Sequence, residues 1–227
     1  MLEFEGVTAA EVIFEVATRP TDAELDTVLR FAKSQIAVDK LVQDAVNSGK
    51  PLSKAAQAYA LLNASVQDLM KLDRTEAVYE AILSRQNVPV EYLREALTGL
   101  AGLQKKDAVS LLLSMIGAND ASGQTSNISS LGQLLTEQPA AALKKARNTL
   151  EDLATKGKAE ETRRLGYAAI MTADGSGENA LFAASQSKDS LRDWLAAVPS
   201  ISNAELRGNL FSSVRSLMFE LPPNLKA

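Results

Sequence analysis

Histidine and cysteine are both absent from this chain of 227 residues. Serine–histidine and cysteine–histidine nucleophile pairs, zinc sites built from His and Cys, and thioether-linked haem each need at least one of these two residues. The sequence therefore excludes those classes of enzyme and cofactor site. We accordingly predict a protein that is not an enzyme, with no catalytic, cofactor-binding or metal-binding residues and no bound cofactor.

Aromatic residues are scarce, at 5% of the chain, and acidic residues outnumber basic ones by 28 to 24. A net charge of −4 provides no positive field to attract phosphates, and few aromatic rings are present on which bases could stack. We therefore expect no nucleic-acid partner.

Long hydrophobic runs are also missing. Apolar runs such as the leucines at 111–113 are soon cut by Ser, Gly or charge and stay far short of the ~20 residues that a membrane helix needs. The first residues, Met-Leu-Glu-Phe-Glu, carry acids where a secretory signal would carry Lys or Arg. We expect no membrane insertion and no export through a signal at this position, and the lack of thiols leaves the cellular compartment open.

What the chain does contain is helical periodicity. Apolar residues recur at a spacing of about 3.6 in nearly every segment, and no alternating run of β-branched residues stands between hairpin turns. The sequence predicts an all-α fold. Start signals include capping boxes at Thr21 with Glu24 and at Asp73 with Glu76, and single caps at Ser65 and Asp107.

One polar stretch interrupts this pattern. Residues 117–127 read Gly-Ala-Asn-Asp-Ala-Ser-Gly-Gln-Thr-Ser-Asn and are the richest in turn-forming residues. We predict a single helical-repeat domain over residues 1–227, with a mobile loop or subdomain boundary at 117–127. A bend is also expected near Ala37 inside the second helix.

A weak internal repeat supports a particular all-α architecture. The segments that begin at Glu91 and Glu161 align so that Arg94 matches Arg164, and a third copy places Arg207 at the same position. An Arg followed by small and apolar residues on a helix resembles the second helix of HEAT-type repeats. We predict a HEAT-like α-solenoid or solenoid-like bundle of antiparallel helix pairs; an irregular helical bundle is the alternative.

The predicted buried seam combines apolar residues from all parts of the chain. Its members are Val28, Leu29, Leu93, Leu97, Leu100, Leu112, Ile170, Leu191 and Trp194.

Several segments together resemble one protein family. Leu69–Ala101, Thr172–Ser176 and Ser190–Ile201 are similar, in the same order, to helical parts of the bacterial PVC-type haem-binding proteins, large multidomain membrane-bound dehydrogenases; Arg19–Leu29 fits their upstream part more loosely. In that family a propeller commonly precedes a HEAT-like region, and a c-type cytochrome domain carries a Cys-x-x-Cys-His site. The resemblance implies that this chain is the helical connector alone, from a parent that is exported or periplasmic, and it carries over no haem ligand.

Other candidate sites favour structural interpretations. Asp152, Glu160 and Glu161 would be the most suggestive carboxylate cluster, but helix-end charges explain them. The segment 174–178, Asp-Gly-Ser-Gly-Glu, has oxygen ligands at close spacing but lacks the EF-hand pattern. Asn127-Ile-Ser129 fits a glycosylation acceptor in form only.

A local basic patch in the middle of the chain is interrupted by acidic residues, and we interpret it as a paired outer face; an acidic partner surface is the alternative. Its members are Lys144, Lys145, Arg147, Lys156 and Lys158.

The functional expectation follows from these points. The chain is expected to be a non-catalytic helical-repeat scaffold that orients flanking domains of a larger protein and offers a protein-interaction surface. A stand-alone helical adaptor that binds a protein or peptide is the alternative, and an enzyme that uses only carboxylates or lysine is a third hypothesis.

Overall fold

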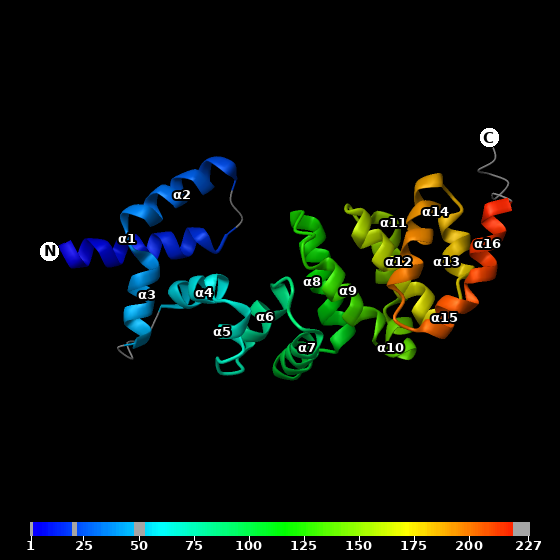
Figure 1. Ribbon diagram of the computed structural model, residues 1–227, viewed down its shortest axis with the longest axis horizontal. Helices are drawn as coiled ribbons and strands as arrows, with labels where there is room; N and C mark the ends of the chain where they lie inside the picture. The colour runs from blue at the N-terminus through cyan, green and yellow to red at the C-terminus, as the bar shows by residue number, and fades with distance from the viewer. Residues whose placement is uncertain (1, 20–21, 48–52, 220–227) are drawn as a thin grey trace. The chain divides into compact units, whose positions relative to one another are not determined.

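The computed structural model describes residues 2–19, 22–47 and 53–219 (Figure 1). Helix accounts for 78% of the chain, and no strand occurs in the described ranges. The all-α prediction is confirmed. Among the described helices, none is both long enough and apolar enough to cross a lipid bilayer.

The chain divides into two compact units, Met1–Ile82 and Leu83–Ala227. The single-domain expectation for residues 1–227 stays a prediction. The expected loop at 117–127 lies inside the second unit, and its first six residues belong to a helix that continues to Ser122, so the loop prediction was wrong there.

Among its described residues, the first unit contains five helices and the start of a sixth, which continues into the second unit. They are α1 (Leu2–Ala17), α2 (Ala23–Gln35), α3 (Val38–Asn47), α4 (Lys54–Asn63), α5 (Val66–Leu69) and α6 (Glu76–Ser84).

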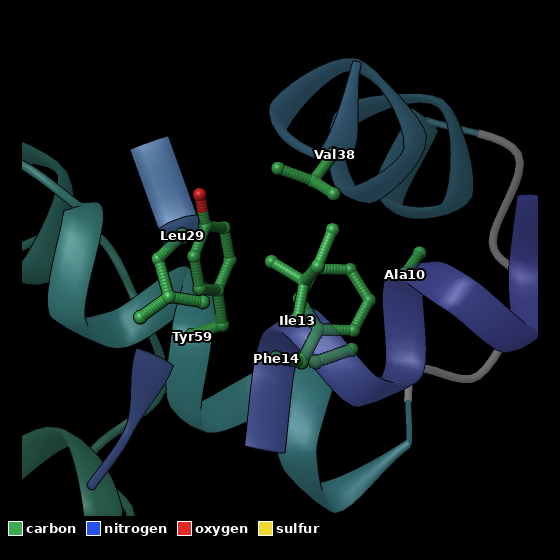
Figure 2. Packing of buried hydrophobic residues seen from close by; sticks show 7 residues of the cluster. Ala10, Ile13, Phe14, Leu29, Val38 and Tyr59 are labelled. Carbon is green, nitrogen blue, oxygen red and sulfur yellow. The ribbon is translucent and has the colours of Figure 1, made fainter. Parts of the chain in front are cut away.

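A small hydrophobic core joins the first four of these helices (Figure 2). Ile13 and Phe14 of α1 meet Leu29 of α2, Val38 of α3 and Tyr59 of α4. The rings of Phe14 and Tyr59 lie 5.0 Å apart in a tilted arrangement, which suits aromatic pairs. Helices α3 and α4 have 10 residues each and are too short to be stable alone, so this cluster is what holds them to α1 and α2.

Tyr59 also makes two polar interactions, a hydrogen bond and a cation–π contact. Its hydroxyl donates a hydrogen bond to Oδ1 of Asp39 at 2.9 Å, and the ammonium of Lys33 lies 4.8 Å from its ring centre. Burial, followed by the Asp39 carboxylate, raises the pKa of Tyr59 to about 12. The tyrosine therefore stays protonated and serves as a hydrogen-bond donor between α3 and α4.

The predicted buried stripe of α2 is narrower than expected. Leu29 is buried, whereas Val28 is 62% exposed and Leu25 is 37% exposed. The prediction that Val28 belongs to the buried seam was wrong, because α2 turns only one edge toward the core. The expected cap Thr21 lies outside the described residues, and Asp22 instead accepts a hydrogen bond from the N–H of Leu25 at 2.8 Å.

Most other helix boundaries follow their local signals. The break between α2 and α3 at Ile36, which has extended backbone angles, agrees with the bend predicted near Ala37. Ser65 and Asp107 cap α5 and the helix after Asp107 as expected. The capping box at Asp73 was wrong, since the hydroxyl of Thr75 accepts the hydrogen bond from the N–H of Val78 at 3.4 Å.

The second unit contains the remaining helices. They are α7 (Val90–Gln104), α8 (Ala108–Ser122), α9 (Ile128–Thr136), α10 (Ala140–Lys145), α11 (Arg147–Lys156), α12 (Glu160–Asp174), α13 (Glu178–Ala184), α14 (Lys188–Ala197), the 3₁₀ turn η1 (Val198–Ser200), α15 (Ala204–Asn209) and α16 (Phe211–Phe219).

Helix α12 is the centre of this unit (Figure 1). It packs against α9, α10, α11, α13 and α14, and most of its residues are buried. It approaches α11 closely at Gly166, where an added Cβ would lie only 2.7 Å from Cα of Ala154. A small residue at Gly166 is therefore what lets these two backbones come together.

The rest of the predicted seam is buried as expected. Trp194 is completely inaccessible, which confirms the prediction of a core residue. The other buried members are Leu29, Leu93, Leu97, Leu100, Leu112, Ile170 and Leu191.

Candidate binding groove

A groove of about 660 Å³ runs between α9, α12 and the segment from the end of α14 into α15. Its lining is mixed: apolar Ile128 and Leu165 lie among polar side chains such as Ser129 and Gln133. A second hollow of about 640 Å³ shares Glu137 and Ser202 with this groove. Concave surfaces with a few placed polar groups are the default binding sites of a protein.

Glu137, at the end of α9, is fixed on one side of the groove by Arg94 of α7. Nε and Nη2 of Arg94 each donate a hydrogen bond at 2.8 Å to the two carboxylate oxygens, and Gln133 adds a third at 3.2 Å. The Arg94 guanidinium lowers the pKa of Glu137, which makes this carboxylate an acceptor and a poor proton donor.

Arg164 lies on the α12 side of the groove and belongs to a charge cluster around the buried Asp193. Its partners are Glu160, one turn earlier, and the carboxylate of Asp193 on α14, whose Oδ1 is 3.5 Å from Nε of Arg164. The Asp193 side chain is only 1% exposed. Nε of Arg163 approaches its other oxygen at 2.7 Å, so two guanidinium groups compensate this buried charge.

Arg163 has a second role, which a later arginine repeats. Its Nη1 donates to the carbonyls of Gly157 and Lys158, at 3.1 and 3.0 Å. Arg207 on α15 likewise donates through Nη1 to the carbonyls of the residues six and five positions before it. Both arginines stand four residues after the N-cap of their helix.

The internal repeat is therefore displaced by one residue from its predicted alignment. Arg207 corresponds to Arg163, whereas Arg94 and Arg164 each stand five residues after their N-caps. Sequence comparison favoured Arg164 because small residues follow it. The contact between Arg163 and Asp193 joins residues 30 positions apart, so it is not visible in a local sequence pattern.

Glu161 completes the charged lining of the groove. It is exposed and forms no ion pair with any of the described residues. Asp152, which the sequence placed in the same cluster, instead pairs with Lys156 at 2.6 Å, and Glu160 pairs with Arg164 and Arg192. These three carboxylates do not converge on a common point.

The segment 174–178 forms a structural turn and not a metal site. Asp174 pairs with Arg147 and accepts a hydrogen bond from Asn179 at 3.1 Å, and Gly175 ends α12 with φ of 68°. Glycine suits this left-handed position because it has no Cβ. Within the described part of the chain, no group of three or more acidic residues is arranged to hold a metal ion.

Asn127 is also occupied. Its side-chain nitrogen donates to the carbonyl of Leu83 at 3.1 Å, and its oxygen accepts from Asn119 at 2.8 Å. The residue is 4% exposed. The amide is thus a buried link inside the second unit and is inaccessible to a glycosylating enzyme in the folded protein.

The predicted basic patch is largely paired. Arg147 contacts Glu151 and Asp174, and Lys156 contacts Asp152. Lys158 donates to the carbonyl of Ala121 at 3.0 Å. Lys144 and Lys145 remain exposed at the end of α10. This pattern agrees with the interpretation as a paired outer face.

Comparison with known proteins gives no match to a protein family, a curated protein or a solved structure. The class defined by the described residues is therefore an all-helical protein with a polar groove in its second unit.

Proposed function

We propose that the chain is a non-catalytic helical-repeat scaffold whose groove binds a partner protein segment. The arrangement of α9, α12 and α14 supports this proposal most directly. Helix α12 packs against both α9 and α14, and each of the three also packs on the helix that precedes it, α8, α11 and α13 respectively. Helix pairs stacked through their second helices are the arrangement expected of a HEAT-like solenoid.

The charges around the groove support a binding role over a catalytic one. Glu137, Arg164 and Asp193 are bound to oppositely charged partners, which holds them in fixed positions. Gln133 and Ser129 offer exposed amide and hydroxyl groups that suit a peptide backbone. A partner segment would thus meet a preorganised polar wall over an apolar floor.

The partner segment can belong to the same polypeptide or to a separate protein, and these two cases give two versions of the proposed function. The resemblance to PVC-type haem-binding proteins implies a connector inside a larger protein, and such a scaffold would place a segment of its own polypeptide in the groove. A stand-alone adaptor would bind a separate protein. The size and mixed lining of the groove favour a peptide-like occupant in both versions.

Site-specific photo-crosslinking tests the proposal. A benzoylphenylalanine is introduced in place of Ser129, which is exposed and lines the groove, and the full chain is irradiated in cells of its source. We expect one defined cross-linked product. A cross-link within the same polypeptide would identify a scaffold, and a cross-link to another protein would identify an adaptor.

The matched control carries the same photo-reactive residue in place of Lys144, which is exposed on α10 and does not line the groove. It is expected to give no defined product. If positions 129 and 144 gave the same products, or if neither gave one, the groove would not be the binding surface.

A further inference from the structure

Two exposed carboxylates line the groove and the hollow beside it, and neither forms an ion pair with the described residues. Glu161 on α12 lines the groove, and Glu205 on α15 lines the second hollow. The two hollows adjoin, since Glu137 and Ser202 line both. We infer that the segment bound here is basic, with Lys or Arg side chains that pair with Glu161 and Glu205; its binding place rests on the groove proposed above.

Two other charged side chains of the lining already have oppositely charged partners. Both carboxylate oxygens of Glu137 accept hydrogen bonds from Arg94 at 2.8 Å. Arg164 pairs with Glu160 and lies 3.5 Å from the buried carboxylate of Asp193. Because these charges are compensated inside the protein, they do not select the charge of an occupant. That selection falls to the side chains of the lining without such a partner.

Arg207 is the cation of the lining that could instead favour an acidic occupant. It is partly buried, and its Nη1 donates hydrogen bonds to the carbonyls of Ile201 and Ser202. Its guanidinium is therefore engaged in holding the turn that leads into α15. Glu161 and Glu205 are exposed, so their carboxylates are accessible to the ammonium or guanidinium of an occupant. Two accessible carboxylates against one engaged guanidinium favour a basic segment.

A basic polypeptide segment suits these carboxylates better than a metal ion does. A metal site needs several ligands that converge, and in the described part of the chain no three acidic residues are grouped in that way. Separate Lys or Arg side chains need one carboxylate each, and the adjoining hollows of about 660 and 640 Å³ give room for several side chains. Exposed ion pairs contribute little affinity, so Glu161 and Glu205 act mainly on the choice of partner.

Selection from a random peptide library tests the inference. The full chain is the bait, and the phage display random peptides of about 12 residues, which span roughly 40 Å when extended. Lys and Arg should be enriched in the selected peptides relative to the unselected library. With Glu161→Lys as the bait, the enrichment should move to Asp and Glu. A basic peptide selected on the unchanged chain should bind Glu161→Lys at least about tenfold more weakly, because attraction becomes repulsion.

Glu178→Lys is the matched control. Glu178 is exposed on α13 and lines neither hollow, and its replacement changes the net charge by the same amount as Glu161→Lys. This control should select the same basic peptides and bind them within about twofold of the unchanged chain. If it shifted the preference as much as Glu161→Lys does, overall charge alone would act and the inference would be wrong. Selection of neutral or acidic peptides would overturn it as well.

Ser129→Trp separates this inference from the groove proposal. Ser129 is exposed in the groove, so a tryptophan there should occlude the binding surface and abolish binding of the selected peptides. Peptides that Ser129→Trp no longer binds, but that show no enrichment of Lys or Arg, would overturn the inference and leave the groove proposal standing. Peptides that bind Ser129→Trp unchanged, or a library that yields no binder, would overturn both.

Discussion

Asp120 caps a helix to which it does not belong, by accepting a hydrogen bond from the backbone N–H of Ala159. Oδ1 lies 2.9 Å from that nitrogen, and Oδ2 lies 2.8 Å from the nitrogen of the preceding residue, Lys158. Ala159 is the N-cap of α12 and has no side chain that could perform this role. A carboxylate near the end of α8 thus satisfies the first donors of the central helix.

Replacing Asp120 with Ala should destabilise the second unit by about 1–2 kcal/mol, the usual cost of losing an N-cap. The buried Trp194, the chain's only tryptophan, lies in that unit, so urea denaturation followed by its fluorescence measures the effect. Asp152→Ala is the control, since Asp152 is 62% exposed and pairs with Lys156 on the surface. If both variants unfolded at the same urea concentration, the cap would contribute nothing.

The contribution of the Asp120 carboxylate to the stability of the second unit should depend on pH. Burial alone would raise the pKa of Asp120, but the N–H groups of Ala159 and Lys158 outweigh it and hold the pKa below its usual value of 3.8. A lowered folded-state pKa means that the stabilisation is complete above the unfolded-state pKa and is lost as the pH falls through the folded one. The stability difference between the unchanged chain and Asp120→Asn should therefore be constant from about pH 5 to 7 and shrink below about pH 4. A difference that grew on acidification would contradict this sign.

Gly166→Ala is expected to destabilise the second unit by about 1–3 kcal/mol, the cost of overpacking. The new methyl group would lie 2.7 Å from Cα and 2.9 Å from Cβ of Ala154, and a backbone atom cannot rotate away. Gly117→Ala is the matched control within helix α8, where the added Cβ would meet nothing within 4 Å. That control should be neutral or stabilise by up to about 1 kcal/mol, because Ala has the higher helix propensity. Thermal unfolding that ranked the two variants in the opposite order would disprove the close approach of α11 and α12.

The sequence predicted those features that depend on neighbouring residues. The caps Ser65 and Asp107 bond to N–H groups three residues later, and this spacing is visible in the chain itself. Leu97 and Trp194 are buried as helical periodicity indicated. The all-α class follows from the same local rules.

Features that depend on distant residues could not be predicted in this way. Asp120 stands in a polar stretch that resembles a loop, and its partners lie 38 and 39 residues further along the chain. Val28 fits the apolar spacing of α2 but is exposed, because the packing of α2 on α1 and the rest of the unit decides which edge is covered. The groove also depends on residues that are distant in the sequence. Glu137 in its wall is held by Arg94 of α7, which stands 43 residues earlier.

A double-mutant cycle on Arg163 and Asp193 should show that this pair is a buried structural link. Asp193→Leu removes a carboxylate that is 1% exposed and leaves Arg163, itself 23% exposed, without its main partner. We expect a loss of about 3–5 kcal/mol, typical of breaking a buried ion pair from one side. The double variant Arg163→Met/Asp193→Leu should recover part of it, because two apolar side chains of similar length need no compensating charge. Urea denaturation of all four proteins gives the coupling energy. If the losses simply added, the arginine and the aspartate would not interact, and the link between α12 and α14 would have to lie elsewhere.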